Sequence, residues 1–213
     1  NKPTDPKRFD DMDLAEREAS YGRMGFTLQF MLDTTLADMD RYPLKLSDLI
    51  VMNCNPKNAP DKVIWAASPD LVDKDLPNVG FNGDRYYRPM VTQGEWTEYT
   101  GSVMAIDPAG RGEDETSYAV VKMLHSQLFV LESGGFEGGY TTKVLEELAN
   151  VAKRQSVNAI LTESNFGDGM FTALLTPIMA RVHPCEIEEV RHSVQKERRI
   201  IDTLEPVMSS HSL

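Results

Sequence analysis

Four short apolar segments after residue 100 constrain the fold of this chain more than any other feature. The first three have the length and apolar content of β-strands and are joined by short turns: 102–106, 117–124 and 127–132. They predict an antiparallel three-strand meander. A helix capped by Thr141 or Thr142 then leads to a fourth strand at 158–163. Because a helical crossover places the next strand parallel in the same sheet, the first and fourth strands should run in one direction.

The rest of the chain divides at about residue 94. After the fourth strand, the pattern predicts a helix around 170–182, a fifth strand at 185–190 and a helical period over 196–208. Residues 95–213 therefore read as one α/β domain with a mixed sheet flanked by helices. Residues 1–94 read as a mostly irregular extension, helical at 13–40 and then rich in loops, without a second core.

Charge and composition exclude several classes of protein. With 22 Lys and Arg against 33 Asp and Glu, the net charge of −11 repels a polyanion, so nucleic-acid binding requires a local basic patch or a bound metal. No run approaches the roughly 18 apolar residues of a membrane-spanning helix. Cys54 and Cys185 stand far apart, which indicates neither a disulfide framework nor a zinc site.

Two carboxylates close the two strands that we expect to be parallel. Asp107 follows 103–106 and Glu163 follows 159–162. Ligand sites of open α/β sheets usually lie at the carboxyl ends of the strands, and converging carboxylates repel unless a hard cation such as Mg²⁺ or Mn²⁺ lies between them. Two such ions can activate water for phosphodiester hydrolysis. The alternative is that Asp107, before Pro108, merely starts a turn and that Glu163 begins a loop.

Further candidates surround this pair. Asp168 is a possible additional metal ligand, although an Asp between two glycines at a helix entrance is more often a cap. Arg191, Lys196 and Arg199 belong to the densest basic cluster of the chain and are candidate DNA phosphate contacts. Lys196 and Arg199 share one helix face. A solvated helix face is the alternative for this cluster.

Several strings resemble a known family. They occupy 30–33 (FMLD), 41–46 (RYPLKL), 104–108 (MAIDP), 163–169 (ESNFGDG) and 202–207 (DTLEPV). Together they resemble the large terminase subunit, or DNA maturase, of short-tailed phages, and the similarity runs across nearly the whole chain.

The resemblance implies a ribonuclease-H-like nuclease that cuts concatemeric phage DNA during genome packaging with two divalent ions. It implies that Asp107 and Glu163 are the first two acidic metal ligands. The family has a third metal-binding aspartate in a later C-terminal helix, and no matching segment occurs before Leu213, so we expect this chain alone to lack one ligand.

The resemblance further implies that residues 1–94 link the nuclease to an upstream ATPase motor, which agrees with the absence of a Walker A motif from this sequence. The expected partners of the intact protein are double-stranded DNA, the portal and the small terminase subunit, in the host-cell cytoplasm.

Two other functions stay open at this point. Asp107 and Gly110 could belong to the phosphate hairpin of an actin-like ATPase, a fold with the same early meander. The chain could also be a non-catalytic docking module between motor and portal, which would require Asp107 and Glu163 to lie far apart.

Overall fold

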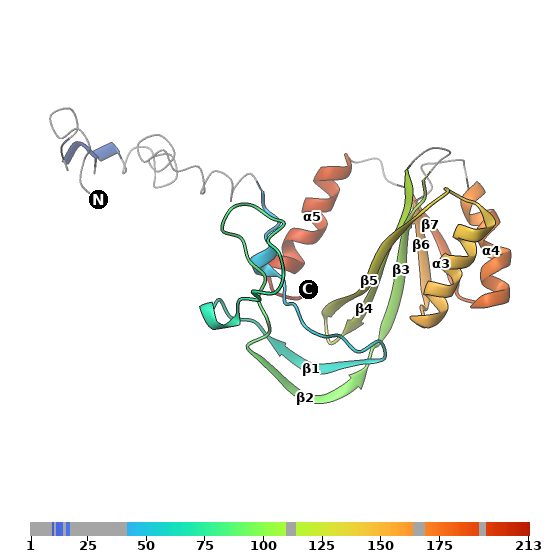
Figure 1. Cartoon of the computed structure of the whole chain (residues 1–213), viewed down its shortest axis with the longest axis horizontal. Coiled ribbons are helices and arrows are strands. Elements are labelled where there is room, and N and C mark those ends of the chain that lie inside the picture. The colour runs from blue at the N-terminus through green and yellow to red at the C-terminus, as the bar shows by residue number, and fades with distance from the viewer. Residues whose placement is uncertain are drawn as a thin grey trace.

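A computed structural model describes residues 10, 12–14, 16–17, 42–109, 114–163, 169–191 and 195–213 of the chain (Figure 1). The helices expected within 13–40 lie almost entirely outside these residues. In chain order, the main elements are β1 (Asn58–Ile64), β2 (Val91–Glu98), β3 (Gly101–Asp107), β4 (Glu115–Leu124), β5 (Gln127–Glu137), α3 (Thr142–Arg154), β6 (Ala159–Glu163), α4 (Met170–Val182), β7 (Glu186–Val190) and α5 (Lys196–Ser209). Two short 3-10 helices, η1 (Leu46–Asp48) and η2 (Pro69–Leu71), precede β2.

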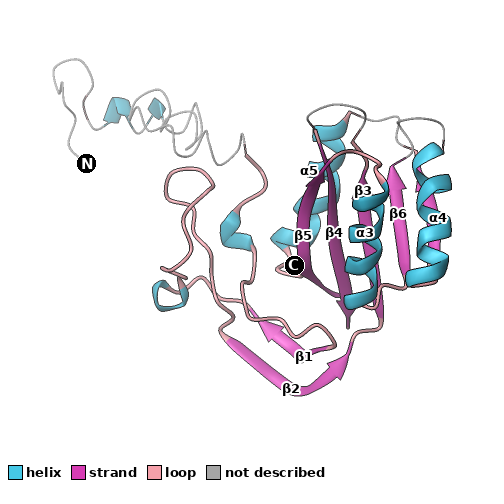
Figure 2. Ribbon diagram, turned by 45° about the vertical axis from the view of Figure 1, so that its right-hand side comes forward, coloured by secondary structure: helices cyan, strands magenta, loops and turns pink. Residues whose placement is uncertain are grey.

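The domain is organised around a five-stranded sheet with the order β5-β4-β3-β6-β7. Strands β5, β4, β3 and β6 are seen side by side in Figure 2. Strand β4 pairs antiparallel with both β3 and β5, which confirms the expected meander. Strand β6 pairs parallel with β3, and β7 pairs parallel with β6. The helical crossover through α3 thus has the predicted consequence: β3 and β6 are neighbours and their carboxyl ends lie at the same edge of the sheet.

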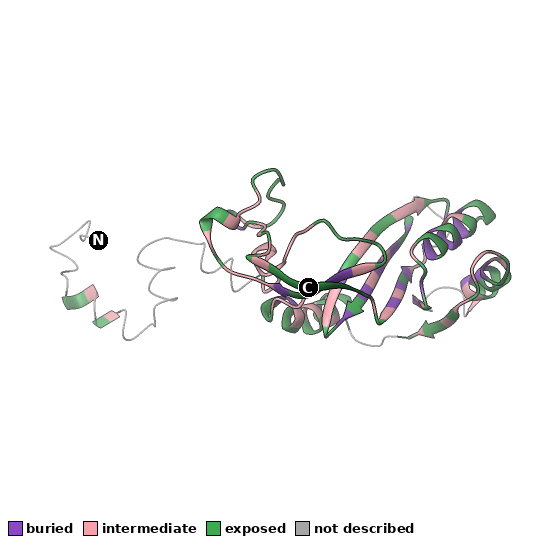
Figure 3. Cartoon of the chain, turned by 90° about the horizontal axis from the view of Figure 1, so that it is seen from below, coloured by how far each residue is buried: buried purple, intermediate pink, exposed green. Residues whose placement is uncertain are grey.

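Helices α3 and α4 cover one face of this sheet (Figure 1). Successive strand residues point to opposite faces, and every second residue of β3 is buried. Met104 and Ile106 of this set pack in one cluster with residues of the two helices, and Figure 3 shows buried positions on the sheet and on the helices. Leu148 and Leu175 are almost completely buried in the same cluster. Within the described part of the chain, no helix combines the length and apolar character needed to cross a bilayer.

Helix α5 lies on the opposite face of the sheet from α3 and α4 (Figure 1). Its one buried side chain, Met208, is near its C-terminal end. The residues that follow α5 continue this attachment, because the Leu128 N–H of β5 donates to the Ser212 carbonyl at 2.7 Å and the Ile50 N–H donates to the Leu213 carbonyl at 3.1 Å. The C-terminal end of α5 is therefore tied to the fold more firmly than its N-terminal end.

The segment before the domain has more structure than the sequence indicated. Strands β1 and β2 pair antiparallel, and Ala59 and Val63 of β1 form a second hydrophobic cluster with Leu124 and Phe129 of the sheet. This part of the chain therefore adds a paired strand to the loops that the sequence predicted, and its apolar residues pack on the sheet instead of forming a core of their own. The prolines of this segment make the local sequence look unlike a strand. The apolar partners of β1 come from β4 and β5, more than 60 positions further along, so no local pattern indicates them.

Candidate active site

The edge shared by β3 and β6 brings two carboxylates onto one face of the sheet. The parallel register pairs Ala105 with Leu161 and Ile106 with Thr162. Asp107 and Glu163 each follow one position later, and side chains two positions apart on a strand share a face. Both therefore lie on the face of Ala105 and Leu161, which is the face toward α5, and both line the same cavity.

Helix α5 directs two cations at these carboxylates. The Lys196 ammonium donates to Asp107 Oδ2 at 2.7 Å. The Arg199 guanidinium donates through Nη1 and Nη2 to Glu163 Oε1, each at 3.2 Å. Residues three apart on a helix share a face, which explains why these two side chains reach neighbouring strand ends together.

The two ion pairs differ in their exposure to solvent. The side chains of Lys196 and Asp107 are 60% and 47% exposed, whereas those of Arg199 and Glu163 are 22% and 16% exposed. The hydrogen bond to Asp107 and the charge of that carboxylate raise the pKa of Lys196, and the more distant charge of Glu163 adds to this effect while Arg199 opposes it. The four groups therefore act as one electrostatic cluster.

A cavity of about 460 Å³ opens between the sheet and α5 at this cluster. Its floor consists of small or apolar side chains of three adjacent strands, namely Ala105, Ala119, Ser117 and Leu161. Asp107, Glu163, Lys196 and Arg199 supply the charged lining. The floor residues were absent from the predicted site because a small residue in a strand carries no chemical signal of its own.

The donor set is compatible with a hard divalent cation. Mg²⁺ is commonly held through one or two carboxylates, with water and substrate phosphate oxygens completing its shell. Among the residues that the structure describes, no three His, Cys, Asp or Glu side chains gather closely enough to hold a metal ion by themselves. The described residues therefore fit a cation whose coordination shell is completed by oxygens of a phosphate substrate.

The remaining predicted site residues are placed less fully. Arg191 directly follows β7, the neighbour of β6, and its side chain is exposed. It is not among the residues that line the cavity. Asp168 lies outside the described residues, and its role stays a prediction.

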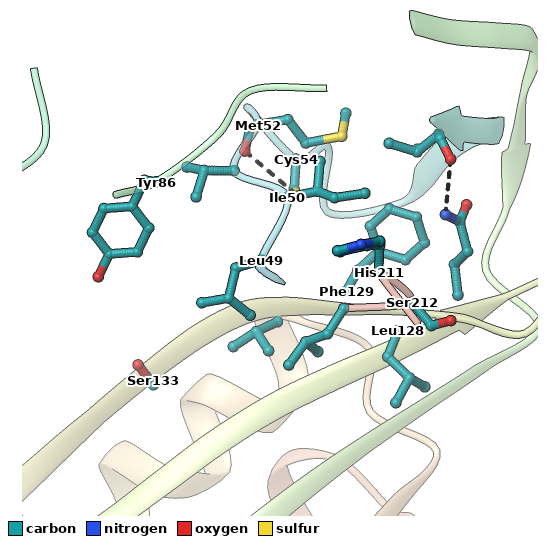
Figure 4. Close-up of a pocket in the computed structure, with 15 residues that line it drawn as sticks. Leu49, Ile50, Met52, Cys54, Tyr86, Leu128, Phe129, Ser133, His211 and Ser212 are labelled. Carbon is teal, nitrogen blue, oxygen red and sulfur yellow. Dashed lines mark hydrogen bonds between the residues drawn. The ribbon is translucent and has the colours of Figure 1, made fainter. Parts of the chain in front are cut away.

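A second cavity, of about 490 Å³, shares no lining residue with the cavity that holds the carboxylates. Figure 4 shows the side chains that line it. Segment 49–54, strand β5 and the C-terminal residues 211–213 surround it. It is the larger of the two, but its lining contains no Asp, Glu, Lys or Arg. It therefore lacks the groups that phosphodiester chemistry needs, and the smaller charged cavity is the candidate active site.

Comparison with known proteins agrees with this fold. The family described as the ribonuclease-H-like domain of the bacteriophage T7 terminase matches residues 106–213. The chain belongs to this family. The matched region begins at the end of β3 and includes β6 and α5, so it contains both carboxylates and both cations of the candidate site.

One relative matches over the whole chain. The large terminase subunit of Enterobacteria phage T3 is 45% identical over 212 residues, which cover 100% of this chain and 36% of that protein. The chain thus spans about a third of the length of this relative. The resemblance to large terminase subunits and the ribonuclease-H-like fold expected from it are both confirmed.

Two solved structures are similar at a greater distance. The manganese-soaked, inhibitor-bound nuclease domain of the human cytomegalovirus terminase has a TM-score of 0.40 and 10% identity, covering 54% of this chain and 61% of that chain. The large terminase nuclease of thermophilic phage G20c also has a TM-score of 0.40 and 10% identity, covering 53% and 56%.

Proposed function

We propose that this chain is the nuclease part of a phage DNA-packaging terminase and that it hydrolyses phosphodiester bonds of double-stranded DNA. The observation that carries the proposal is the convergence of Asp107 and Glu163 on one face of adjacent parallel strands, inside a charged cavity. Membership of the terminase family supports the same reaction.

In this proposal the chain's own residues hold and orient the reactants. Asp107 and Glu163 would hold Mg²⁺ or Mn²⁺, with two ions in the complete site and Asp168 as a further candidate ligand. When bound, such ions polarise the phosphodiester and activate water. Lys196, Arg199 and Arg191 would contact DNA phosphates, and the apolar floor of the cavity would limit the access of bulk water.

The biological setting follows from the family as part of the same proposal. The substrate would be concatemeric phage DNA, cut during genome packaging in the host-cell cytoplasm. Residues 1–94 would link the nuclease domain, 95–213, to the motor of the longer protein. The portal and the small terminase subunit would be partners of that longer protein.

The other functions are less well supported. A docking module without catalysis required the two carboxylates to lie far apart, and they close neighbouring strands instead. The actin-like alternative depends on a hairpin that includes Gly110, which lies outside the described residues.

Cleavage of supercoiled plasmid in the presence of Mn²⁺ tests the proposal. Asp107→Asn and Glu163→Gln keep the size of each side chain and remove its charge, and each should lower the nicking rate roughly a hundredfold or more. Glu186→Gln removes one charge from the opposite end of β7 and is the matched control. Nicking that survives both site substitutions at the control rate would refute the proposed nuclease site.

A further inference from the structure

The Lys196 ammonium contacts a carboxylate oxygen that a metal ion at this site would bind. Its Nζ lies 2.7 Å from Asp107 Oδ2. A Mg²⁺ ion bound to a carboxylate oxygen lies at about 2.0 to 2.1 Å and requires a regular shell of oxygen ligands. An ammonium group donating to the same oxygen at hydrogen-bond distance would share that space with the ion and repel it. The lysine and a metal ion therefore compete for this oxygen.

The charges of the cluster lead to the same conclusion. Asp107 and Glu163 contribute two negative charges, and Lys196 and Arg199 contribute two positive charges. The sum is zero, so an approaching divalent cation gains little net attraction while both internal cations remain in place. One of them must leave before the carboxylates attract a metal ion strongly.

The exposure of the two pairs indicates which cation leaves. Lys196 is largely exposed, and a lysine head group on a flexible stem is readily solvated by water. Arg199 is mostly buried beside Glu163, where its planar guanidinium donates two hydrogen bonds. Moving Lys196 into solvent costs less than moving Arg199, because exposed ion pairs contribute little to stability.

We propose that Lys196 is a displaceable counter-ion of the candidate site, and that a divalent cation binds Asp107 by exchanging with the Lys196 ammonium. This inference rests on the proposed function, because it takes Asp107 as a metal ligand. It deepens that function by assigning Lys196 a role in controlling when the carboxylate becomes available.

The exchange does not require α5 to detach. The buried anchor of the helix, Met208, is twelve positions from Lys196, which corresponds to about 18 Å along the helix axis. The N-terminal end of α5 carries exposed side chains, so the lysine can rotate out of the cavity while the other end stays packed. Once released, its ammonium lies at the mouth of the cavity, where a DNA phosphate is the natural new partner. Metal binding and phosphate binding by Lys196 are then coupled.

Mn²⁺ titration of the 213-residue chain, followed by the electron paramagnetic resonance signal of free Mn²⁺, tests this exchange without any need for cleavage. Lys196→Ala should bind Mn²⁺ roughly tenfold more tightly than the unmodified chain, because a competing positive charge is gone. Arg198→Ala removes the same charge from the same helix at an exposed position paired with Asp202, and it should change the affinity less than about twofold. Lys196→Arg keeps the charge and should stay close to the unmodified affinity.

Three outcomes are distinguishable. If Asp107→Asn abolishes Mn²⁺ binding and Lys196→Ala strengthens it beyond Arg198→Ala, the exchange is supported. If Asp107→Asn abolishes binding while Lys196→Ala behaves like Arg198→Ala or binds more weakly, the exchange is refuted and the proposed metal site stands. If Asp107→Asn binds Mn²⁺ as the unmodified chain does, the metal site and the exchange are both refuted.

Discussion

The two faces of the five-stranded sheet differ in what their side chains do. Toward α3 and α4, Met104, Val120 and Ile160 are completely buried. Toward α5, Ala105 is exposed and Leu161 is only half-buried, and this face ends in a cluster of four charges. Apolar burial is the main source of stability, so the first face should carry most of the folding free energy. The second face is left free to hold the four charges of the candidate site.

The largest effect on stability should come from the face toward α3. Leu148→Ala removes a side chain that is 1% exposed from the centre of the main cluster. The lost burial and the cavity left behind should lower the free energy of unfolding by about 3 kcal/mol, measured by urea denaturation. Leu161→Ala makes the same chemical change on the α5 face and should cost only about 1 kcal/mol. Equal losses for the two substitutions would contradict the division between the faces.

A smaller but substantial loss should follow when the polar network on the α3 side is broken. Glu132 of β5 accepts hydrogen bonds from Tyr118 at 2.8 Å, from Gln155 at 2.8 Å and from the guanidinium of Arg154. Glu132→Gln leaves these donors with a weaker, neutral acceptor and should lower the free energy of unfolding by roughly 2 kcal/mol. Glu146→Gln, in the exposed pair with Arg181, is the matched control and should cost less than about 0.5 kcal/mol.

The contribution of Glu132 to the free energy of unfolding should depend on pH. The hydrogen bond from Arg154 is the largest cause that lowers the pKa of Glu132 from 4.5 to about 2. Since the pKa is lower in the folded state, the contribution of Glu132 is fully present above about pH 4.5 and is lost as the pH falls toward 2. The difference in unfolding free energy between the unmodified chain and Glu132→Gln should therefore shrink from pH 6 to pH 3. A constant difference over that range would show that folding does not lower the pKa of Glu132.

Much of the domain could be predicted because its signals are local. The apolar runs that became β3, β4 and β6 have strand length, and the apolar face of α3 repeats at helical spacing. The pairing of Asp107 with Glu163 followed from one topological rule about crossovers. The position of both carboxylates at strand ends was therefore readable without coordinates.

What could not be predicted depends on contacts between distant parts of the chain. Lys196 and Asp107 are separated by 89 positions, so no local sequence pattern predicts that α5 contacts the carboxylates. Strand β5 continues through Gly134, beyond the predicted end of this strand at 132, and Gly134 pairs with Tyr118 of β4. Helix α5 likewise continues through Pro206, a residue type that usually kinks or breaks a helix interior. In both cases packing outweighs local propensity.

An intermediate effect is expected where the C-terminal residues are attached to the fold. The His211 ring stacks on Trp65 with centroids 3.7 Å apart and planes 8° from parallel. His211→Ala should lower the free energy of unfolding by about 1 kcal/mol and increase the exposure of Trp65, seen as a red shift of its fluorescence. His125→Ala, at an exposed histidine beside Asp61, should leave both quantities nearly unchanged. A loss as small as that of the control would mean that the stack does not hold the C-terminal residues in place.

The smallest effect on stability is expected at the residue with the largest proposed effect on function. Asp107→Asn breaks an ion pair whose two side chains are about half exposed, and such pairs contribute about 0 to 1 kcal/mol. The substitution also removes the repulsion between Asp107 and Glu163, which offsets part of that loss. The net change in unfolding free energy should therefore stay within about 0.5 kcal/mol, measured by urea denaturation without divalent ions. A loss above about 2 kcal/mol would identify Asp107 as a structural group, because a carboxylate kept for chemistry should be nearly dispensable for folding.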